Sequence, residues 1–237
     1  MYPQDAQLAT ILKAPAPATI ADVIERMQAM DAVLPTNDGL KWFNWLYLKV
    51  TQQVDLNPPG GAWRNPQWLT RLDVVFAGLY FDAVAGYLSG TPIPAAWSAM
   101  LDARMRTGID RIQFALAGMN AHIDHDLAMA LLTTDSVLNV VPTKGGAEYA
   151  DFESVNSLLK GLMPLVLTTL ASDTLGVLAE DAGKVGRMLA FWDLCQARNL
   201  AWDFADELHG LGGIERAAAL DAQNATTGGL GRALLAF

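Results

Sequence analysis

The sequence of 237 residues contains a single cysteine, Cys195. One cysteine cannot form an internal disulfide, and it excludes a zinc site with four thiolate ligands. Several enzyme motifs are also missing from the sequence: the G-x-S-x-G elbow, the G-x-x-x-x-G-K-[ST] phosphate loop, the G-x-G-x-x-G fingerprint, the H-E-x-x-H zinc motif and the paired E-x-x-H motif of di-iron bundles. Short motifs therefore do not reveal the chemistry of this chain.

Charge is scarce and mostly acidic. Charged residues make up 17% of the chain and hydrophobic residues 52%, which excludes disorder and predicts a large buried core. The chain has 16 Lys and Arg residues against 25 Asp and Glu residues, and the basic residues do not cluster. Because nucleic-acid binding needs clustered basic side chains, we expect no nucleic-acid partner.

Long uncharged apolar runs are absent too. The longest candidate, DVVFAGLYFDAVAGYL, carries Asp73 and Asp82 and falls short of the roughly 18 uncharged residues that cross a bilayer. Residues 1–18 lack the basic and apolar regions of a secretory signal, and we interpret them as an N-terminal extension with a Pro-Ala spacer. We therefore expect a cytoplasmic protein with no membrane span.

Helix start and stop signals occur along the whole chain, whereas period-two alternation is nearly absent. The sequence therefore predicts an all-α fold, a single compact bundle of seven or eight helices with a buried central helix, formed by residues 19–237. No linker or repeat divides this domain, and the sequence is compatible with a homo-oligomer. The expected helices cover residues 20–34, 39–55, 66–89, 94–107, 109–133, 149–171, 174–210 and 213–235, the last interrupted at TTGG.

The most polar group of residues in an apolar setting lies in the helix expected at 109–133. Its apolar stripe comprises Ile112, Leu116, Met119, Ile123, Leu127 and Ala130. His122 and Asp126 flank this stripe at positions i and i+4, so their side chains are neighbours on one helix face. A carboxylate among apolar neighbours costs several kcal/mol unless it is paired. We therefore expect His122 and Asp126 to interact, with Asp126 raising the basicity of His122.

This pair has two interpretations. It is either an acid and base pair for proton transfer, or a structural contact of the kind that often only fixes packing. His125 falls on nearly the opposite helix face, where we expect it to be solvated.

Two earlier helices supply further candidates. In the helix expected at 66–89, Asp73 and Tyr80 lie on one flank, seven residues apart. We expect Asp73 to approach His122 and Asp126 around one cavity.

The helix expected at 39–55 is aromatic on nearly all sides. Trp42, Asn44, Trp45 and Tyr47 are the candidates here for a substrate pocket, because an apolar pocket needs a few placed polar atoms. The alternative is that these aromatic residues only fill the core.

Tyr80 and Asn120 are further candidates for binding the substrate, and Trp202, in the segment ARNLAWDFADEL, is the last. Arg198 precedes it by one turn, so we expect Arg198 to be solvated and to lie over the Trp202 indole. The alternative is that this cation reaches a carboxylate on another helix or an anionic ligand.

Five segments in this order, NDGLKWFNWLYLKVT, LDVVFAGLYFDA, PAAWSAM, GMNAHIDHDLAMAL and ARNLAWDFADEL, resemble a bacterial protein family known as domain of unknown function 5995. The most specific piece is N-A-H-I-x-x-D-L, which carries Asn120, His122 and Asp126. The resemblance implies a single helical domain, and it adds weight to Asp73, His122 and Asp126 acting together.

The sequence thus leads to three hypotheses. The first is a small-molecule enzyme that binds a mostly apolar metabolite in an aromatic pocket and uses His122, Asp126 and Asp73 for acid and base chemistry, with no cofactor. The second is a divalent-metal-dependent enzyme in which the same three residues are the ligands. The third is a non-catalytic protein that binds a ligand or a helical partner.

Overall fold

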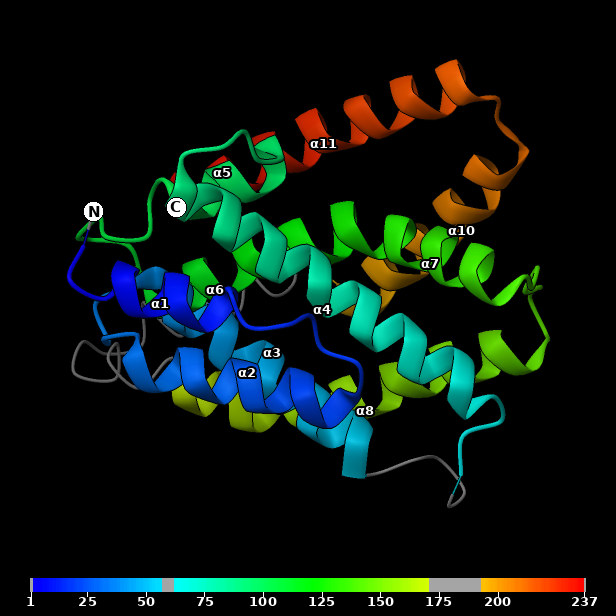
Figure 1. The fold of residues 1–237 in the computed structure, drawn as a ribbon, viewed down its shortest axis with the longest axis horizontal. Helices are drawn as coiled ribbons and strands as arrows, with labels where there is room; N and C mark the ends of the chain where they lie inside the picture. The colour runs from blue at the N-terminus through cyan, green and yellow to red at the C-terminus, as the bar shows by residue number, and fades with distance from the viewer. Residues whose placement is uncertain (1, 57–61, 171–192, 237) are drawn as a thin grey trace.

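The computed structural model describes residues 2–56, 62–170 and 193–236, and these residues form helices and connecting turns with no strand among them (Figure 1). The all-α prediction is confirmed. The helices are α1 (Asp5–Leu12), α2 (Ile20–Val33), α3 (Gly39–Leu56), α4 (Pro66–Ser89), α5 (Ala95–Leu101), α6 (Arg111–Asn120), a π-helical turn η2 (Ala121–Asp126), α7 (Leu127–Leu138), α8 (Ala147–Leu170), α10 (Leu194–Gly210) and α11 (Gly213–Ala236).

Local sequence signals determine several helix ends. Thr19 and Asp22 form the expected capping box of α2, since each side chain bonds the backbone of the other residue. Asn65 caps α4, which has Pro66 at its first position. Gly90 ends α4 with φ of 73°, a left-handed conformation that favours glycine.

The structure corrects three helix predictions. The long helix expected at 109–133 continues to Leu138 and contains a π-helical turn at its centre. α11 is not interrupted at TTGG, because its glycines allow close packing: a Cβ on Gly228 would lie 2.7 Å from the carbonyl oxygen of Ala95 on α5. The N-terminal extension also forms a helix, α1, so seven or eight helices is an underestimate for the described residues. Residues 174–192 of the helix expected at 174–210 lie outside them.

The rod formed by α6, η2 and α7 is the expected central helix. It packs against α3, α4, α5, α10 and α11, so its sides are covered by other helices (Figure 1). Its many small residues, such as Gly118 facing the Phe43 ring, permit this close approach. The core that surrounds it is rich in large aromatic side chains, and Phe43, Trp68, Tyr80 and Trp97 are fully or almost fully buried.

α4 has the length and composition of a membrane-spanning helix. An 18-residue window within it has a mean hydropathy of 1.3, and it is the one helix among the described residues that meets this test. Half of that window is buried inside the fold, as in the core helices of soluble proteins.

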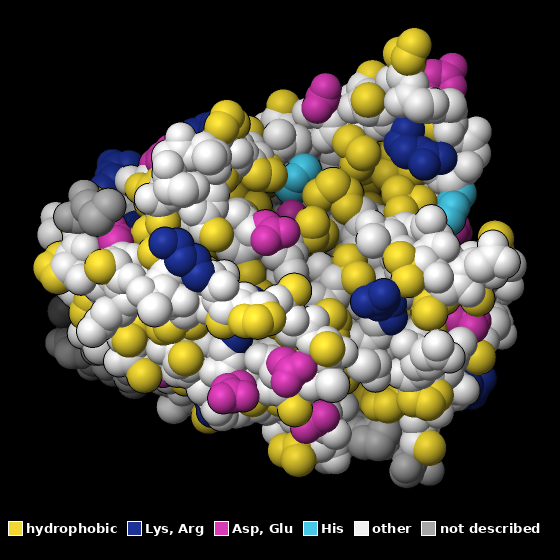
Figure 2. Space-filling view, in the orientation of Figure 1, with side chains coloured by type: hydrophobic (Ala, Val, Ile, Leu, Met, Phe, Trp, Pro, Cys, Tyr) yellow, Lys and Arg dark blue, Asp and Glu magenta, His cyan; other side chains and the backbone are white. Residues whose placement is uncertain are grey.

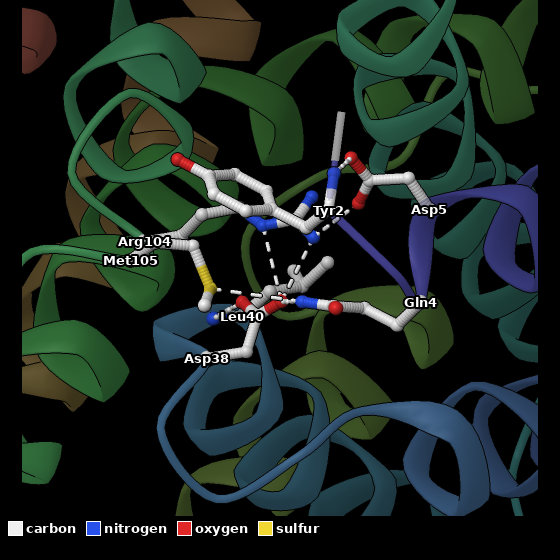
Figure 3. Close-up of polar contacts among 7 residues, drawn as sticks. All are labelled: Tyr2, Gln4, Asp5, Asp38, Leu40, Arg104 and Met105. Atoms are coloured by element: carbon white, nitrogen blue, oxygen red, sulfur yellow. Dashed lines mark hydrogen bonds and ion pairs between the residues drawn. The ribbon is translucent and has the colours of Figure 1, made fainter.

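A buried cluster around Arg104 attaches α1 to the rest of the molecule (Figure 3). Arg104 is fully buried, and its Nη2 lies 2.6 Å from Asp5 Oδ1 and 2.8 Å from Asp38 Oδ2. Asp38 also accepts hydrogen bonds from the Gln4 side chain at 2.6 Å and from the backbone N–H of Leu40 at 3.0 Å, which caps α3. Most donors and acceptors of this cluster are thus paired within the protein.

Candidate functional site

The π-helical turn η2 places its polar residues in the centre of the bundle. A π-helical turn has i to i+5 hydrogen bonds and is therefore wider than an α-helical turn, and such turns occur often at functional sites. α4, α5, α10 and α11 all contact η2. The wider turn and these neighbours explain why His125, expected to be solvated, is only 5% exposed.

Asp126 joins two side chains from different elements. Its Oδ2 lies 3.1 Å from His122 Nδ1 and accepts a hydrogen bond of 2.9 Å from the indole Nε1 of Trp97 on α5. All three side chains are almost completely buried. The neighbouring positions of His122 and Asp126 are as predicted. The role of Trp97 could not be predicted from the sequence, because Trp97 lies 29 residues from Asp126 and nothing in PAAWSAM indicates its partner.

Aromatic rings enclose the His122 imidazole. The Phe76 ring of α4 stacks on it with 3.5 Å between centroids and 6° between planes, and the Tyr47 ring of α3 approaches at 4.5 Å. Phe43 and Trp97 complete the enclosure at 5.7 and 5.9 Å. His122 Nδ1 is bonded to Asp126, but Nε2 is buried and has no hydrogen-bond partner.

Burial governs the electrostatics of this pair. Loss of hydration lowers the pKa of His122 well below its usual 6.5. It raises the pKa of Asp126 well above 3.8, and the hydrogen bond from Trp97 opposes this only in part. The direction for His122 is opposite to the one expected from an acidic neighbour, because desolvation outweighs the attraction. The lowered pKa favours the neutral imidazole, and in the tautomer that donates Nδ1–H to Asp126 the Nε2 lone pair is free.

His125 lies on the other side of the same carboxylate. Its Nε2 is 4.0 Å from Asp126 Oδ1, and its Nδ1 is buried without a hydrogen-bond partner. Burial lowers the pKa of His125 to about 4, so it is neutral at physiological pH. Figure 2 shows a histidine side chain on the floor of a hollow between α5, α7 and α11, surrounded by hydrophobic side chains. The π-helical turn contributes Asp124 to a pocket lined by residues of α10 and α11.

The similarity of the sequence to known proteins agrees with this architecture. A model described as a family of unknown function, DUF5995, matches residues 20–237. The chain belongs to the DUF5995 family. The resemblance stated from the sequence is confirmed, and α1 lies outside the matched region. No curated protein and no solved structure matches the chain.

Asp73 is not part of the central pair of the DUF5995 domain. Its side chain is partly buried, its Oδ2 is fully buried without a hydrogen-bond partner, and it makes no hydrogen bond or ion pair with His122 or Asp126. Burial raises the pKa of Tyr47, whose ring contacts His122, and the charge of Asp73 adds to this shift. Among the described residues, no three His, Cys, Asp or Glu side chains are arranged to hold a metal ion, so the three proposed ligands do not converge.

Two polar candidates for the aromatic pocket form hydrogen bonds within the core. Asn44 donates to the carbonyl oxygen of Met27 at 3.0 Å and accepts from the Tyr80 hydroxyl at 3.1 Å. Asn120 donates to the carbonyl oxygen of Thr227 on α11 at 2.9 Å, and its Oδ1 is buried without a partner.

The tryptophan candidates lie in different places. Trp42 is at the start of α3, where its Nε1 donates to the carbonyl oxygen of Thr36 and the Arg111 guanidinium lies 4.0 Å over its ring. Trp45 is partly buried. Trp202 belongs to a separate aromatic cluster with Trp68, Tyr149 and Phe152.

Arg198 is neither solvated nor stacked on Trp202, so that expectation is wrong. It is 7% exposed, its guanidinium lies 4.2 Å over the Phe152 ring, and it donates to Asn156 Oδ1 and to the carbonyl oxygen of Phe152 at 2.8 and 3.0 Å. The reason is that α8 crosses this face of α10 and offers uncharged acceptors there. Among the described residues, Arg198 forms no ion pair with a carboxylate either.

A pocket of about 370 Å³ opens between α3, α6, α8 and the start of α10. Its walls are mainly aliphatic and include Leu46, Leu116, Met119 and Met163, with Cys195 at one end. This volume is within the range of small-molecule sites. His122 does not line the pocket, but Met119 precedes it by one helical turn.

Proposed function

We propose that this DUF5995 protein is an enzyme that acts on a small, mostly apolar molecule, with His122 as the general base and acid. One observation carries the proposal: His122 is a neutral, fully buried imidazole whose Nδ1 is held by Asp126 and whose Nε2 has no partner. A buried nitrogen without a partner is uncommon in proteins, and its lone pair is free to take a proton.

In this proposal Asp126 fixes the tautomer and orientation of the imidazole, as an acceptor on Nδ1–H. Trp97 holds the Asp126 carboxyl in place, and Phe76 and Tyr47 keep the imidazole ring fixed. The enclosure excludes water, so that a proton on Nε2 passes to the bound molecule rather than to solvent.

The experiment compares wild-type protein with His122→Gln. Each is incubated with a small-molecule extract of cells, and consumed and produced compounds are followed by mass spectrometry. We expect compounds that wild type converts and His122→Gln leaves unchanged. His209→Gln is the matched control, since His209 lies partly exposed on α10. Conversion by the His122→Gln protein at the wild-type rate would contradict the proposal.

A second candidate is a non-catalytic binding protein, and the 370 Å³ apolar pocket favours it because His122 does not line it. This function predicts that an apolar compound copurifies unchanged and is lost in Leu116→Trp, which fills the pocket. It also predicts that His122→Gln retains the compound and that no conversion occurs.

A further inference from the structure

The 370 Å³ pocket between α3, α6, α8 and the start of α10 has aliphatic walls and one polar end. Its described lining residues are all aliphatic or methionine, except for Lys160, Asp193 and Cys195, which form the polar end. The walls include Met119 and Met163, and methionine adapts its shape to a flexible neighbour. Since no aromatic ring is among these lining residues, the walls suit an aliphatic chain rather than a ring that needs a stacking partner.

Asn156 of α8 brings the groups around the polar end together. Its carbonyl oxygen lies 3.8 Å from Cys195 Sγ, and its Oδ1 accepts a hydrogen bond of 2.8 Å from Arg198 Nε. Lys160 follows Asn156 by one turn of α8, and helical side chains lean toward the preceding turn, so Lys160 lies on the same face as Asn156. Two positive charges, those of Lys160 and Arg198, are therefore present around the polar end.

Neither cation has an ion-pair partner among the described residues. Arg198 is 7% exposed, yet it donates only to uncharged oxygens, Asn156 Oδ1 and the carbonyl oxygen of Phe152. Lys160 is exposed and makes no hydrogen bond or ion pair within the part of the chain that the structure describes. Because buried charges in proteins are usually paired, the Arg198 guanidinium indicates a missing anion near this end.

The acidic side chains close to the polar end have other roles. Asp193 Oδ1 accepts hydrogen bonds from the backbone N–H groups of Cys195 and Gln196 at 2.9 and 3.1 Å, and it thereby caps α10. Glu153 Oε1 accepts a hydrogen bond of 3.2 Å from the Asn156 amide. These two carboxylates therefore do not neutralise the cations.

We infer that this pocket binds an aliphatic carboxylic acid, with the chain along the aliphatic walls and the carboxylate at the polar end beside Lys160. A lysine can lay its stem on apolar surface while its ammonium group stays in water, where it pairs with an anion at the mouth of a pocket. The inference rests on the proposed function in one respect, that the bound molecule is small and mostly apolar, and it adds the chemical class of that molecule.

The single cysteine of the chain provides the readout, because Cys195 lies at the polar end. The rate at which a thiol reagent labels Cys195 is measured at increasing concentrations of decanoate or of decylamine, each below its micelle concentration. At pH 7 the two probes carry opposite charges on chains of equal length. We expect decanoate to halve the labelling rate at a concentration at least about fivefold lower than decylamine does.

Reversal of the lysine charge tests the orientation of the bound acid. We expect Lys160→Glu to reduce the preference for decanoate over decylamine by about fivefold or more. Lys13→Glu is the matched control: it makes the same change in net charge at an exposed lysine that does not line the pocket, and it leaves the preference unchanged. Leu116→Trp fills the pocket and removes protection by both probes. If it does not fold, Met163→Trp at a partly buried position serves the same purpose.

Three results would overturn the inference: equal protection of Cys195 by the two probes, an unchanged preference in Lys160→Glu, or undiminished protection in a folded variant whose pocket is filled. If decanoate does not protect Cys195 while conversion of compounds still depends on His122, the carboxylate site is wrong and the proposed function stands. If decanoate protects Cys195 and no conversion depends on His122, the carboxylate site stands and the enzymatic proposal is wrong.

Discussion

The molecule contains the combination of tryptophan, aspartate and histidine twice, at different depths. The first is the buried cluster on η2 and α5. In the second, Asp135 of α7 accepts a hydrogen bond of 2.8 Å from the Trp68 indole and lies 3.3 Å from Nε2 of His209 on α10. The His209 side chain is 34% exposed, whereas that of His122 is 1% exposed. The two clusters contain the same residue types, but their histidines differ in exposure to water.

The comparison shows how burial changes the surroundings of the histidine in such a cluster. Burial raises the pKa of both carboxyls, Asp126 and Asp135, but only around Asp126 is the histidine also enclosed. His209 reaches water with the part of its ring that does not face Asp135. His122 has a second nitrogen, Nε2, that is buried and has no hydrogen-bond partner among the described residues. The same residue types link two helices near the surface and, in the core, leave one imidazole nitrogen buried without a partner among the described residues.

Loss of the carboxyl gives the largest expected contrast between the clusters. Asp126→Ala leaves Trp97 Nε1 and His122 Nδ1 buried without a partner and creates a small cavity, so we expect a loss of about 3–5 kcal/mol in the free energy of unfolding. Asp135→Ala leaves only the buried Trp68 indole without a partner, because the exposed His209 ring can form hydrogen bonds with water. We expect this variant to lose about 1–3 kcal/mol in the free energy of unfolding. Urea denaturation measures both. Equal losses would show that depth does not distinguish the clusters.

Asp73 extends the comparison to a carboxyl with no partner. Burial, followed by the charge of Asp55, raises its pKa from 3.8 to about 7. Its raised pKa in the folded state means that stability falls as pH rises from about 4 to 7. We expect Asp73→Asn to raise the free energy of unfolding by about 2 kcal/mol at pH 8 and to leave it unchanged at pH 4. The gain at pH 8 is smaller than for a fully buried group because the side chain is partly exposed. If Asp73→Asn were less stable than wild type at pH 8, Asp73 would not be a carboxylate without a partner.

Acid should separate the two histidines. His122 has a lowered pKa, so its contribution to stability is present above about pH 6.5 and falls as pH decreases below that value. Between pH 6.5 and 5.5 we expect wild type to lose about 1 kcal/mol relative to His122→Gln. Asp126 is common to both proteins, so the difference isolates the imidazole. Parallel stability curves would show that folding does not shift the pKa of His122.

The smallest effect is expected at the exposed end of the second cluster. His209→Gln removes a contact whose ring is one third exposed, and such pairs contribute less than about 1 kcal/mol. Thermal unfolding of this variant should be close to that of wild type. A loss as large as that of Asp126→Ala would mean that the surface cluster is as important for stability as the buried one.

Local signals predicted the parts of the fold that depend on neighbouring residues. The capping box of Thr19 and Asp22, the N-cap at Asn65 and the position of His122 beside Asp126 all follow from spacings of three or four residues. The π-helical turn could not be predicted in this way, because it arises from packing against four helices, and with it came the error about His125.

Contacts between distant segments were not accessible from the sequence. Trp97 meets Asp126, and Arg104 meets Asp5 across 99 residues, only because the chain folds back on itself. Spacing along one helix likewise could not reveal that the Tyr47 ring of α3 contacts His122. The sequence predicted that His122 and Asp126 would be buried, but not that His125 and Arg198 would be buried as well, nor which buried polar atoms would lack partners.

The tautomer of His122 tests the central claim most directly. Nitrogen-15 NMR of imidazole-labelled protein distinguishes a neutral ring protonated at Nδ1, a neutral ring protonated at Nε2 and a charged ring, and His209 provides the internal comparison. We predict that His122 remains neutral and protonated at Nδ1 from pH 8 to pH 6, with an unprotonated Nε2, and that Asp126→Asn disturbs this state. A charged imidazole at pH 7, or a proton on Nε2, would contradict the claim that His122 is a buried base with a free lone pair.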